Sequence, residues 1–376
     1  MLDQILKAVF MQIDFHHAVT YILARFSGFK HEEADIVAYS AQYVDDATNA
    51  GVIEFDNQAM YARIASAHKM LDYDNFDKLA NHFAWIPFHF LPGNGGYDVR
   101  DGHELLFVDK LICRPNSHVA RDMVRECVNR RNDKNALHRL GITMHVYADT
   151  WAHQGFVGVQ HVINRASKIE ALGREAHTTD ITGRLKNFFG GLFDDVKSEF
   201  VSSCLPLGHG TVLSYPDQPS LRWRYTNGNG QVVERNNPDD FLEAADRMVA
   251  AMRSFRLGDL SLTQPGLSDT EKNQLQNYIT HIAVEDGEMR HRIWLSAIKA
   301  GEFSFGSVEL EYIPKGEGSW KHAALRTERS EDIKGEVFPY SPEFLQSNWK
   351  CFHDALQSHR LYVLLDLLPR YGICAA

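Results

Sequence analysis

The sequence predicts an all-α, multi-helix fold with one or two small β-hairpin insertions. Apolar residues recur at helical spacing through most of the 376 residues. Strand-like runs around glycine- and asparagine-rich turns are few by comparison. The chain contains no repeat, low-complexity tract or linker, so we expect residues 1–376 to form a single α-helical domain.

Helical patterns can be followed from one end of the chain to the other. We predict helices at residues 12–28, 31–50, within 56–83, and at 117–131, 136–156, 160–172, 192–203, 238–256, 268–299 and 341–368. Gly28 ends the first helix, and Pro87 and Pro92 break any helix in the aromatic-rich segment around them. Two β-hairpin insertions are expected, at residues 205–236, which contain an Asn-Gly-Asn-Gly turn, and at residues 301–320.

The composition excludes several classes of function. Hydrophobic residues make up 44% of the chain, the formal charge is −10, and no block of Lys or Arg is present. A protein that depends on the backbone of duplex nucleic acid for its affinity is therefore not expected. Hydrolysis of a phosphoester stays open, because a bound dication reverses the local charge.

The composition also bears on the cellular compartment and on membrane association. The five cysteines form no Cys-x-x-Cys pair, and their odd number indicates reduced thiols rather than a disulfide framework. No stretch approaches the ~20 apolar residues of a membrane span. The first ten residues lack the features of a signal peptide, so we expect a cytoplasmic protein.

The predicted helix at residues 136–156 carries the strongest chemical signal. His138, His145, Asp149 and His153 follow one another at steps of seven, four and four. Such steps place all four side chains within roughly a quarter of the helix circumference. A row of imidazoles and a carboxylate on an apolar helix is costly to bury unless it binds something, and its spacing suits a zinc ion. The alternative is a core helix whose His and Asp side chains satisfy one another.

Two further candidates lie on the first two helices. His16 lies beside the apolar face of the first helix, and His17 lies opposite that face. Asp45 falls on the inner face of the second helix, whereas Asp46 points away. An aspartate on an inner face needs a cation or several hydrogen-bond donors. His16 can equally be a packed core histidine.

The remaining candidates lie in irregular segments. His89, with His82 in reserve, flanks Trp85 in a segment that forms either a wall of the site or a hydrophobic plug. His209 stands between two glycines that leave its ring free to approach a ligand, with Asp217 eight residues further on. The alternative for this pair is a glycine-rich connection with an incidental histidine. The candidate substrate-binding residues are Trp85 and Trp151.

Taken in order, these segments resemble the zinc-dependent phospholipase C and single-strand nuclease superfamily. The matching pieces are His16, the run Ala41-Gln42-Tyr43-Val44-Asp45, His89, and the series His145-x3-Asp149-x3-His153. The superfamily usually places the last histidine six positions after the aspartate and follows it with a His-x3-Glu helix. Here His153 comes at four positions, and His161 is followed by Arg165. His209 and Asp217 are the available substitutes for the missing pair.

The resemblance implies an all-α enzyme that uses one to three zinc ions to hydrolyse phosphoester bonds. In that case His89, His145 and Asp149 would hold one ion, and Asp45 would bridge ions and orient the nucleophile. His16 would contribute to a second ion and His153 to a neighbouring one. Because the chain is acidic, a small phosphodiester or a lipid head group is expected as substrate in preference to a long nucleic acid.

Two other functions stay open. The first is an HD-type phosphohydrolase, which requires a central His-Asp pair, and the pair available here is His353-Asp354. The second is a non-catalytic α-helical protein that keeps a metal site only as a structural staple. The chain has no Gly-x-Ser-x-Gly sequence and no nucleotide-binding glycine loop, so serine hydrolases and nucleotide-loop enzymes are not expected.

Overall fold

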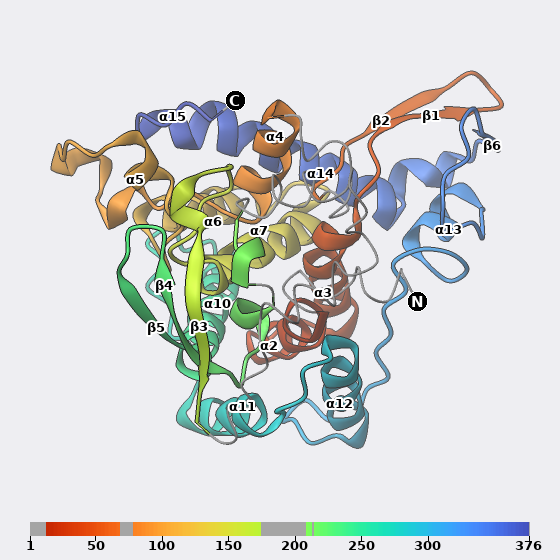
Figure 1. The fold of residues 1–376 in the computed structure, drawn as a ribbon. Coiled ribbons are helices and arrows are strands. Elements are labelled where there is room, and N and C mark those ends of the chain that lie inside the picture. Colours follow the sequence, from red (N-terminus) through yellow and green to blue (C-terminus); the bar gives the residue numbers. More distant parts are fainter. Residues whose placement is uncertain (1–12, 68–77, 174–207, 213, 376) are drawn as a thin grey trace, which may run out of the picture.

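Helices dominate the fold, and two small sheets lie at its edges (Figure 1). A computed structural model describes residues 13–67, 78–173, 208–212 and 214–375. None of the helices in these ranges is both long and apolar enough to cross a lipid bilayer.

The N-terminal part of the described chain is helical, as predicted. The π-helix η2 (Asp14–Val19) continues directly into α2 (Thr20–Phe26). Gly28 follows with a φ of +87°, a conformation that favours glycine, so it ends this segment. The next helix, α3 (His31–Asp46), is four residues shorter than the predicted range of 31–50.

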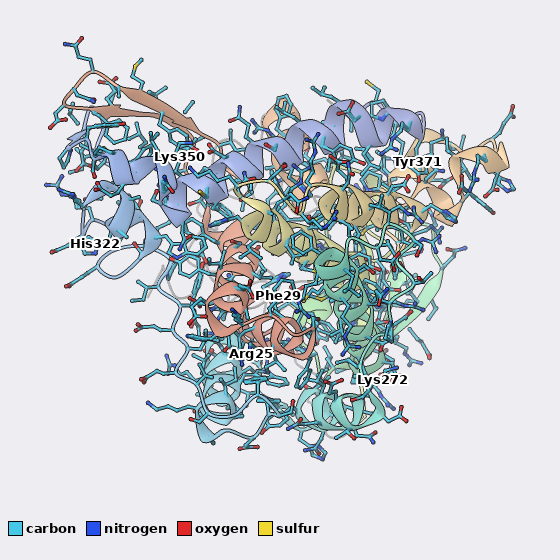
Figure 2. The ribbon with its side chains drawn as sticks, turned by 180° about the vertical axis from the view of Figure 1, so that it is seen from behind. Arg25, Phe29, Lys272, His322, Lys350 and Tyr371 are labelled. Atoms are coloured by element: carbon cyan, nitrogen blue, oxygen red, sulfur yellow. The ribbon has the colours of Figure 1, made fainter. Side chains whose placement is uncertain are left out.

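The helix α7 (Ala136–Ala152) forms the centre of the molecule. All of its residues except Leu137 are buried, which explains its apolar sequence. The helices that pack against it are α3, α4 (Lys78–Phe88), α6 (His118–Asn129), α10 (Asn237–Leu257) and α14 (Asn348–Tyr362). Figure 2 shows the long blue α14 lying across α7 on the side opposite α10 and α11.

Further helices complete the periphery. They are α5 (Phe107–Leu111), α11 (Asp269–His281), α12 (Gly287–Ala300), α13 (Trp320–Leu325), η10 (Val363–Leu367) and α15 (Leu368–Arg370). The predicted range of 268–299 is thus two helices, interrupted between His281 and Gly287. Of these helices, α12 packs against η2 and therefore bears on the site described below.

Each sheet contains three strands. The first has the order β2-β1-β6, formed by β1 (Gly51–Phe55), β2 (Met60–Arg63) and β6 (Val337–Phe338). Its hairpin β1–β2 extends away from the helices (Figure 1). The second sheet has the order β3-β4-β5, formed by β3 (Ala166–Leu172), β4 (Arg222–Asn227) and β5 (Val232–Asn236).

The hairpin expected within residues 205–236 is present as β4 and β5. The second expected hairpin, at residues 301–320, is wrong, because that segment contains no strand and runs as an extended connection into α13. Its polar groups bond to a helix instead of to a partner strand. The Tyr39 hydroxyl donates to the carbonyl of Ile313, and the Tyr312 hydroxyl donates to Asp46.

Other helix predictions also need correction. Residues 51–63 form the hairpin β1–β2, although helical pattern was expected from residue 56. Residues 166–172 form β3, because pairing with β4 satisfies their backbone groups. Pro87 does not prevent a helix before it, and α4 ends one residue later at Phe88. The helix predicted at 192–203 lies outside the described residues.

A close approach of α3 and α7 fixes the distance between them. Gly141 of α7 faces the carbonyl of Val37 and the side chain of Ser40, and a Cβ atom there would overlap both. Neither neighbour can yield easily, because Val37 presents backbone and Ser40 is buried. A residue larger than glycine would therefore push the two helices apart.

We expect Gly141→Ala to destabilise the protein. Helix propensity alone favours alanine by about 1 kcal/mol, whereas overpacking at a rigid contact costs about 1 to 3 kcal/mol. The clash should win, so the free energy of unfolding measured in urea should fall. The matched control is Ser296→Ala on the exposed face of α12, which should change stability little. A stabilised Gly141→Ala variant would contradict the close approach.

Candidate metal centre

The structure brings together eight of the residues that the sequence singles out. They form three groups of donor atoms, His16–Asp45–His145, His89–His145–Asp149 and His153–His209–Asp217, and the first two groups share His145. Within each group the donor atoms all lie within 4.8 Å of one another.

The helix α7 and five segments around it supply these donors. His145 and Asp149 lie on α7 itself, and His153 follows its last residue directly. His16 comes from η2, and Asp45 comes from the last turn of α3. The other three are His89, one residue after α4, His209, one residue before a 3₁₀ turn at Gly210–Val212, and Asp217, at the end of a 3₁₀ turn at Tyr215–Asp217.

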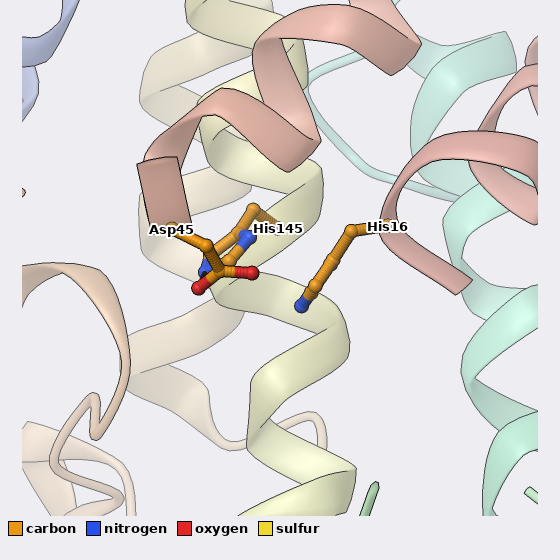
Figure 3. Close-up of side chains that lie close together, drawn as sticks. All are labelled: His16, Asp45 and His145. Carbon is orange, nitrogen blue, oxygen red and sulfur yellow. Dashed lines mark ion pairs between the residues drawn. The ribbon is translucent and has the colours of Figure 1, made fainter. Parts of the chain in front are cut away.

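The first group is shown in Figure 3, where three elements converge on one point. The side chains of His16, Asp45 and His145 point toward one another from η2, α3 and α7. The imidazoles of His16 and His145 are stacked with their centroids 3.9 Å apart. This arrangement leaves ring nitrogens and a carboxylate facing a common space.

The second group has the spacing of ligands around a tetrahedral ion. His89 Nδ1 lies 3.2 Å from His145 Nε2, and each of these atoms lies 3.3 Å from Asp149 Oδ2. With metal–ligand bonds of about 2.0 to 2.1 Å, tetrahedral geometry separates ligand atoms by about 3.3 Å. Asp45 Oδ1 lies 3.8 Å from both nitrogens, so it occupies the side from which a fourth ligand would come.

Backbone contacts fix which nitrogen of His89 faces this group. His89 Nε2 lies 3.1 Å from the carbonyl oxygen of Ser66, which can only accept, so this nitrogen carries the hydrogen. Burial lowers the pKa of His89 to about 4, so the ring is neutral near pH 7 and its Nδ1 bears a lone pair. That lone pair points at the carboxylate of Asp149. A cation bound between these two atoms, which lie 3.3 Å apart, would interact favourably with both.

Asp149 connects the second group with His16. Its Oδ2 atom faces His89 and His145, whereas its Oδ1 atom lies 3.2 Å from His16 Nε2. The carboxylate is fully buried, and it therefore depends on the surrounding imidazoles. Burial acts to raise its pKa, but His153 and His145 outweigh burial and hold the pKa of Asp149 well below its usual value.

The third group is looser than the second. His153 Nε2 and His209 Nε2 each lie 3.8 Å from a different oxygen of Asp217. His153 Nδ1 donates to the carbonyl of His89 at 2.8 Å, which leaves Nε2 directed at Asp217. Phe90 stacks on the His153 ring at 4.5 Å and shields it from water.

The carboxylates of this cluster lack the hydrogen bonds that buried charges need. Both oxygens of Asp45 and both oxygens of Asp217 are buried without a hydrogen-bond partner. Burial, together with the charges of Asp149, Asp46 and Asp217, raises the pKa of Asp45 well above its usual value. Protein groups alone therefore disfavour the ionised form of Asp45, and a bound cation would reverse that preference.

Several predicted residues lie outside the cluster. His138 shares α7 but bonds to Asn348, and it belongs to none of the three groups. His82, held in reserve for His89, contacts the carbonyl of Ala375. Trp151 is only 1% exposed in the main core, so it has no surface to offer a substrate. Trp85 is also buried, although its ring lies 5.2 Å from that of His89.

The sequence did not reveal the residues that position the ligands or their segments without belonging to the three groups. Asp46, expected to point away, accepts hydrogen bonds from Gln42 and Tyr312. The carbonyl of Ser66 fixes the His89 tautomer, and Arg290 binds the segments of His16 and Asp217. Asp14, a polar residue two positions before His16 in a largely apolar helix, was a local sign that this segment has a buried charged partner. Nothing local pointed to partners more than 200 residues away.

The chain was compared with known proteins. The model of a family of unknown function, DUF6765, matches residues 11–367. No curated protein and no solved structure matches the chain. The chemistry of the cluster therefore has to be inferred from its own residues.

We expect acid to destabilise the protein, because the folded state buries histidines in their neutral form. Burial lowers the pKa of His138 and His291 to about 4, from an ordinary value of 6.5. Each such group takes up a proton on unfolding between these two pH values. The free energy of unfolding should therefore fall as pH drops from about 6.5 to about 4, by about 1.4 kcal/mol per pH unit for each histidine.

The variant His138→Gln isolates one of these protons. Glutamine can keep the hydrogen bond to Asn348 but cannot titrate, so the slope of unfolding free energy against pH should decrease by about one proton. Chelator-treated protein is used so that metal binding does not contribute. An unchanged slope would show that His138 is already charged when buried.

Proposed function

The chain belongs to this family of unknown function, DUF6765, and we propose that it is a zinc-dependent hydrolase of phosphoester bonds. Its proposed substrates are small phosphodiesters or phospholipid head groups. The proposed fold relationship is to the zinc-dependent phospholipase C and single-strand nuclease superfamily, on the spacing His145-x3-Asp149 with His16, Asp45 and His89 around it.

One observation carries the proposal. Three donor atoms, from His89, His145 and Asp149, are separated by 3.2 to 3.3 Å, with a lone pair of His89 directed at a carboxylate. A set of imidazole nitrogens and carboxylate oxygens without thiolates suits zinc and also admits other divalent transition metals. Because the cluster holds three carboxylates, more than one dication can be accommodated there.

In this proposal the residues of the cluster bind metal, and Asp45 also takes part in the reaction. Bound zinc would supply Lewis acidity and a water of lowered pKa. Asp149 and Asp217 are fully buried, whereas the side chain of Asp45 keeps 8% exposure. Asp45 is therefore the least buried of the three carboxylates, and its oxygens, which have no hydrogen-bond partner, can orient a water or accept its proton.

Of the two alternatives, the HD-type phosphohydrolase is less well supported by the geometry. His353 and Asp354 do not converge on one site, because His353 packs against Trp349 while Asp354 bonds to Tyr61 and Lys350. No observation favours an HD-type site. A structural metal centre uses the same donors as a catalytic one, and only experiment separates the two.

Metal content is the first test. We expect two or three zinc ions per chain in protein purified without added metal, measured by elemental analysis. His145→Gln should lose at least one ion, because His145 belongs to two of the three groups. The matched control is His138→Gln on the same helix, which is outside all three groups and should keep every ion. Wild-type protein that takes up no metal, even after reconstitution with zinc, would refute the proposal.

The variant Asp45→Asn tests catalysis against a structural role. Hydrolysis of bis(4-nitrophenyl) phosphate and of phospholipid vesicles should fall by about 100-fold or more, because general-base and positioning effects have this size. The melting temperature should change little. The control is Asp366→Asn, which removes an exposed carboxylate of η10 outside the three groups and should keep the activity. A large fall in melting temperature for Asp45→Asn, with no hydrolysis by the wild type, would favour the structural staple.

A further inference from the structure

A single buried arginine lies directly behind the metal centre. Arg290 of α12 is 1% exposed, and its guanidinium makes two hydrogen bonds to Asp14, at 2.8 and 3.2 Å. It also donates to the carbonyls of Val284 and Glu285 at 2.7 and 2.8 Å, and to that of Asp217 at 3.5 Å. These contacts match the five N–H donors of a guanidinium.

The partners of Arg290 belong to segments that carry ligands. Asp14 begins η2, two residues before His16, and Asp217 is itself a member of the third group. The same guanidinium therefore contacts the element that supplies His16 and the turn that supplies Asp217. These two ligands belong to different groups, and no shared donor joins their groups.

The next residue of α12 reinforces the contact with η2. His291 Nε2 lies 2.9 Å from His17 Nδ1, and both rings are buried. Asp14 and His17 are thus both fixed to α12, and His16 lies between them in sequence with its ring directed at Asp149 instead. The contacts of Asp14 and His17 with α12 therefore fix the position of His16.

Replacement of this arginine by lysine would not keep these contacts. The planar guanidinium binds a carboxylate with two parallel hydrogen bonds and still has donors for other acceptors. A lysine ammonium keeps the positive charge for Asp14, but it is a compact group with three donors. It cannot pair with Asp14 in two places and also reach Asp217 and the connection between α11 and α12.

We propose that Arg290 is a positioning residue that holds His16 and Asp217 at a fixed separation across the metal centre. The proposal rests on the metal binding proposed above. It adds that the affinity for metal depends on Arg290, although Arg290 belongs to none of the three groups. Partners behind metal ligands typically change metal affinity by about 10- to 100-fold when they are mutated.

The test is a zinc titration of full-length Arg290→Lys against a chromophoric chelator. We expect zinc affinity to fall by about 10- to 100-fold. The matched control is Arg253→Lys, whose guanidinium also joins separate segments, by donating to the carbonyls of Phe26 and Pro265, but contacts none of the eight candidate ligands. Arg253→Lys should keep the wild-type affinity. Equal affinity in Arg290→Lys and wild type would overturn the positioning role while leaving the proposed function intact.

Double variants separate positioning from a general loss of stability. If Arg290 acts through Asp217, Arg290→Lys should weaken zinc binding much less in an Asp217→Asn background than in the wild type. Fully additive losses would overturn the proposal. If Arg290→Lys does not fold, Asp14→Asn, which keeps an oxygen for Arg290, is titrated with the same expected loss. A wild type that binds no zinc would instead refute the proposed function, and this inference with it.

Discussion

The burial of one carboxylate governs the centre of this molecule. Asp149 has no exposed surface, and its oxygens lie 3.2 to 3.6 Å from nitrogens of His16, His89, His145 and His153. An ionised carboxylate in such a place is stable only when positive charge or several donors surround it. The element η2 and the end of α4 bring His16 and His89 to Asp149, and α7 with the residue that follows it supplies His145 and His153.

The apolar core and the polar cluster depend on each other. Gly141 lets α3 approach α7 closely, and this approach brings Asp45 within 3.8 Å of His89 and His145. On the other side, Phe90 packs against both His153 and His209. The surrounding aromatic side chains exclude water, which strengthens every electrostatic interaction among the donors.

The proposed hydrolase combines a rigid set of ligands with one carboxylate, Asp45, that can act on a water. Asp149 and Asp217 are enclosed, and Arg290 and the carbonyl of Ser66 fix the ligand segments from outside. Asp45 is the least buried of the three carboxylates, and its oxygens have no hydrogen-bond partner. This division suits a metal-assisted hydrolase, because metal binding requires ordered ligands whereas the reacting water requires a carboxylate that is not already hydrogen-bonded.

Periodicity in the sequence determined the helical class, the central helix and the row His145, Asp149 and His153, since these features depend on residues within a few turns. It also pointed to His16 and Asp45, whereas His89 was a candidate from an irregular, aromatic-rich segment and from the resemblance to the phospholipase C and nuclease superfamily. Only the tertiary structure decided that His138 lies outside the site, that residues 301–320 form no hairpin and that Arg290 joins two ligand segments. The physical reason is range: helix periodicity is local, whereas strand pairing, histidine tautomers and ligand geometry depend on partners far along the chain.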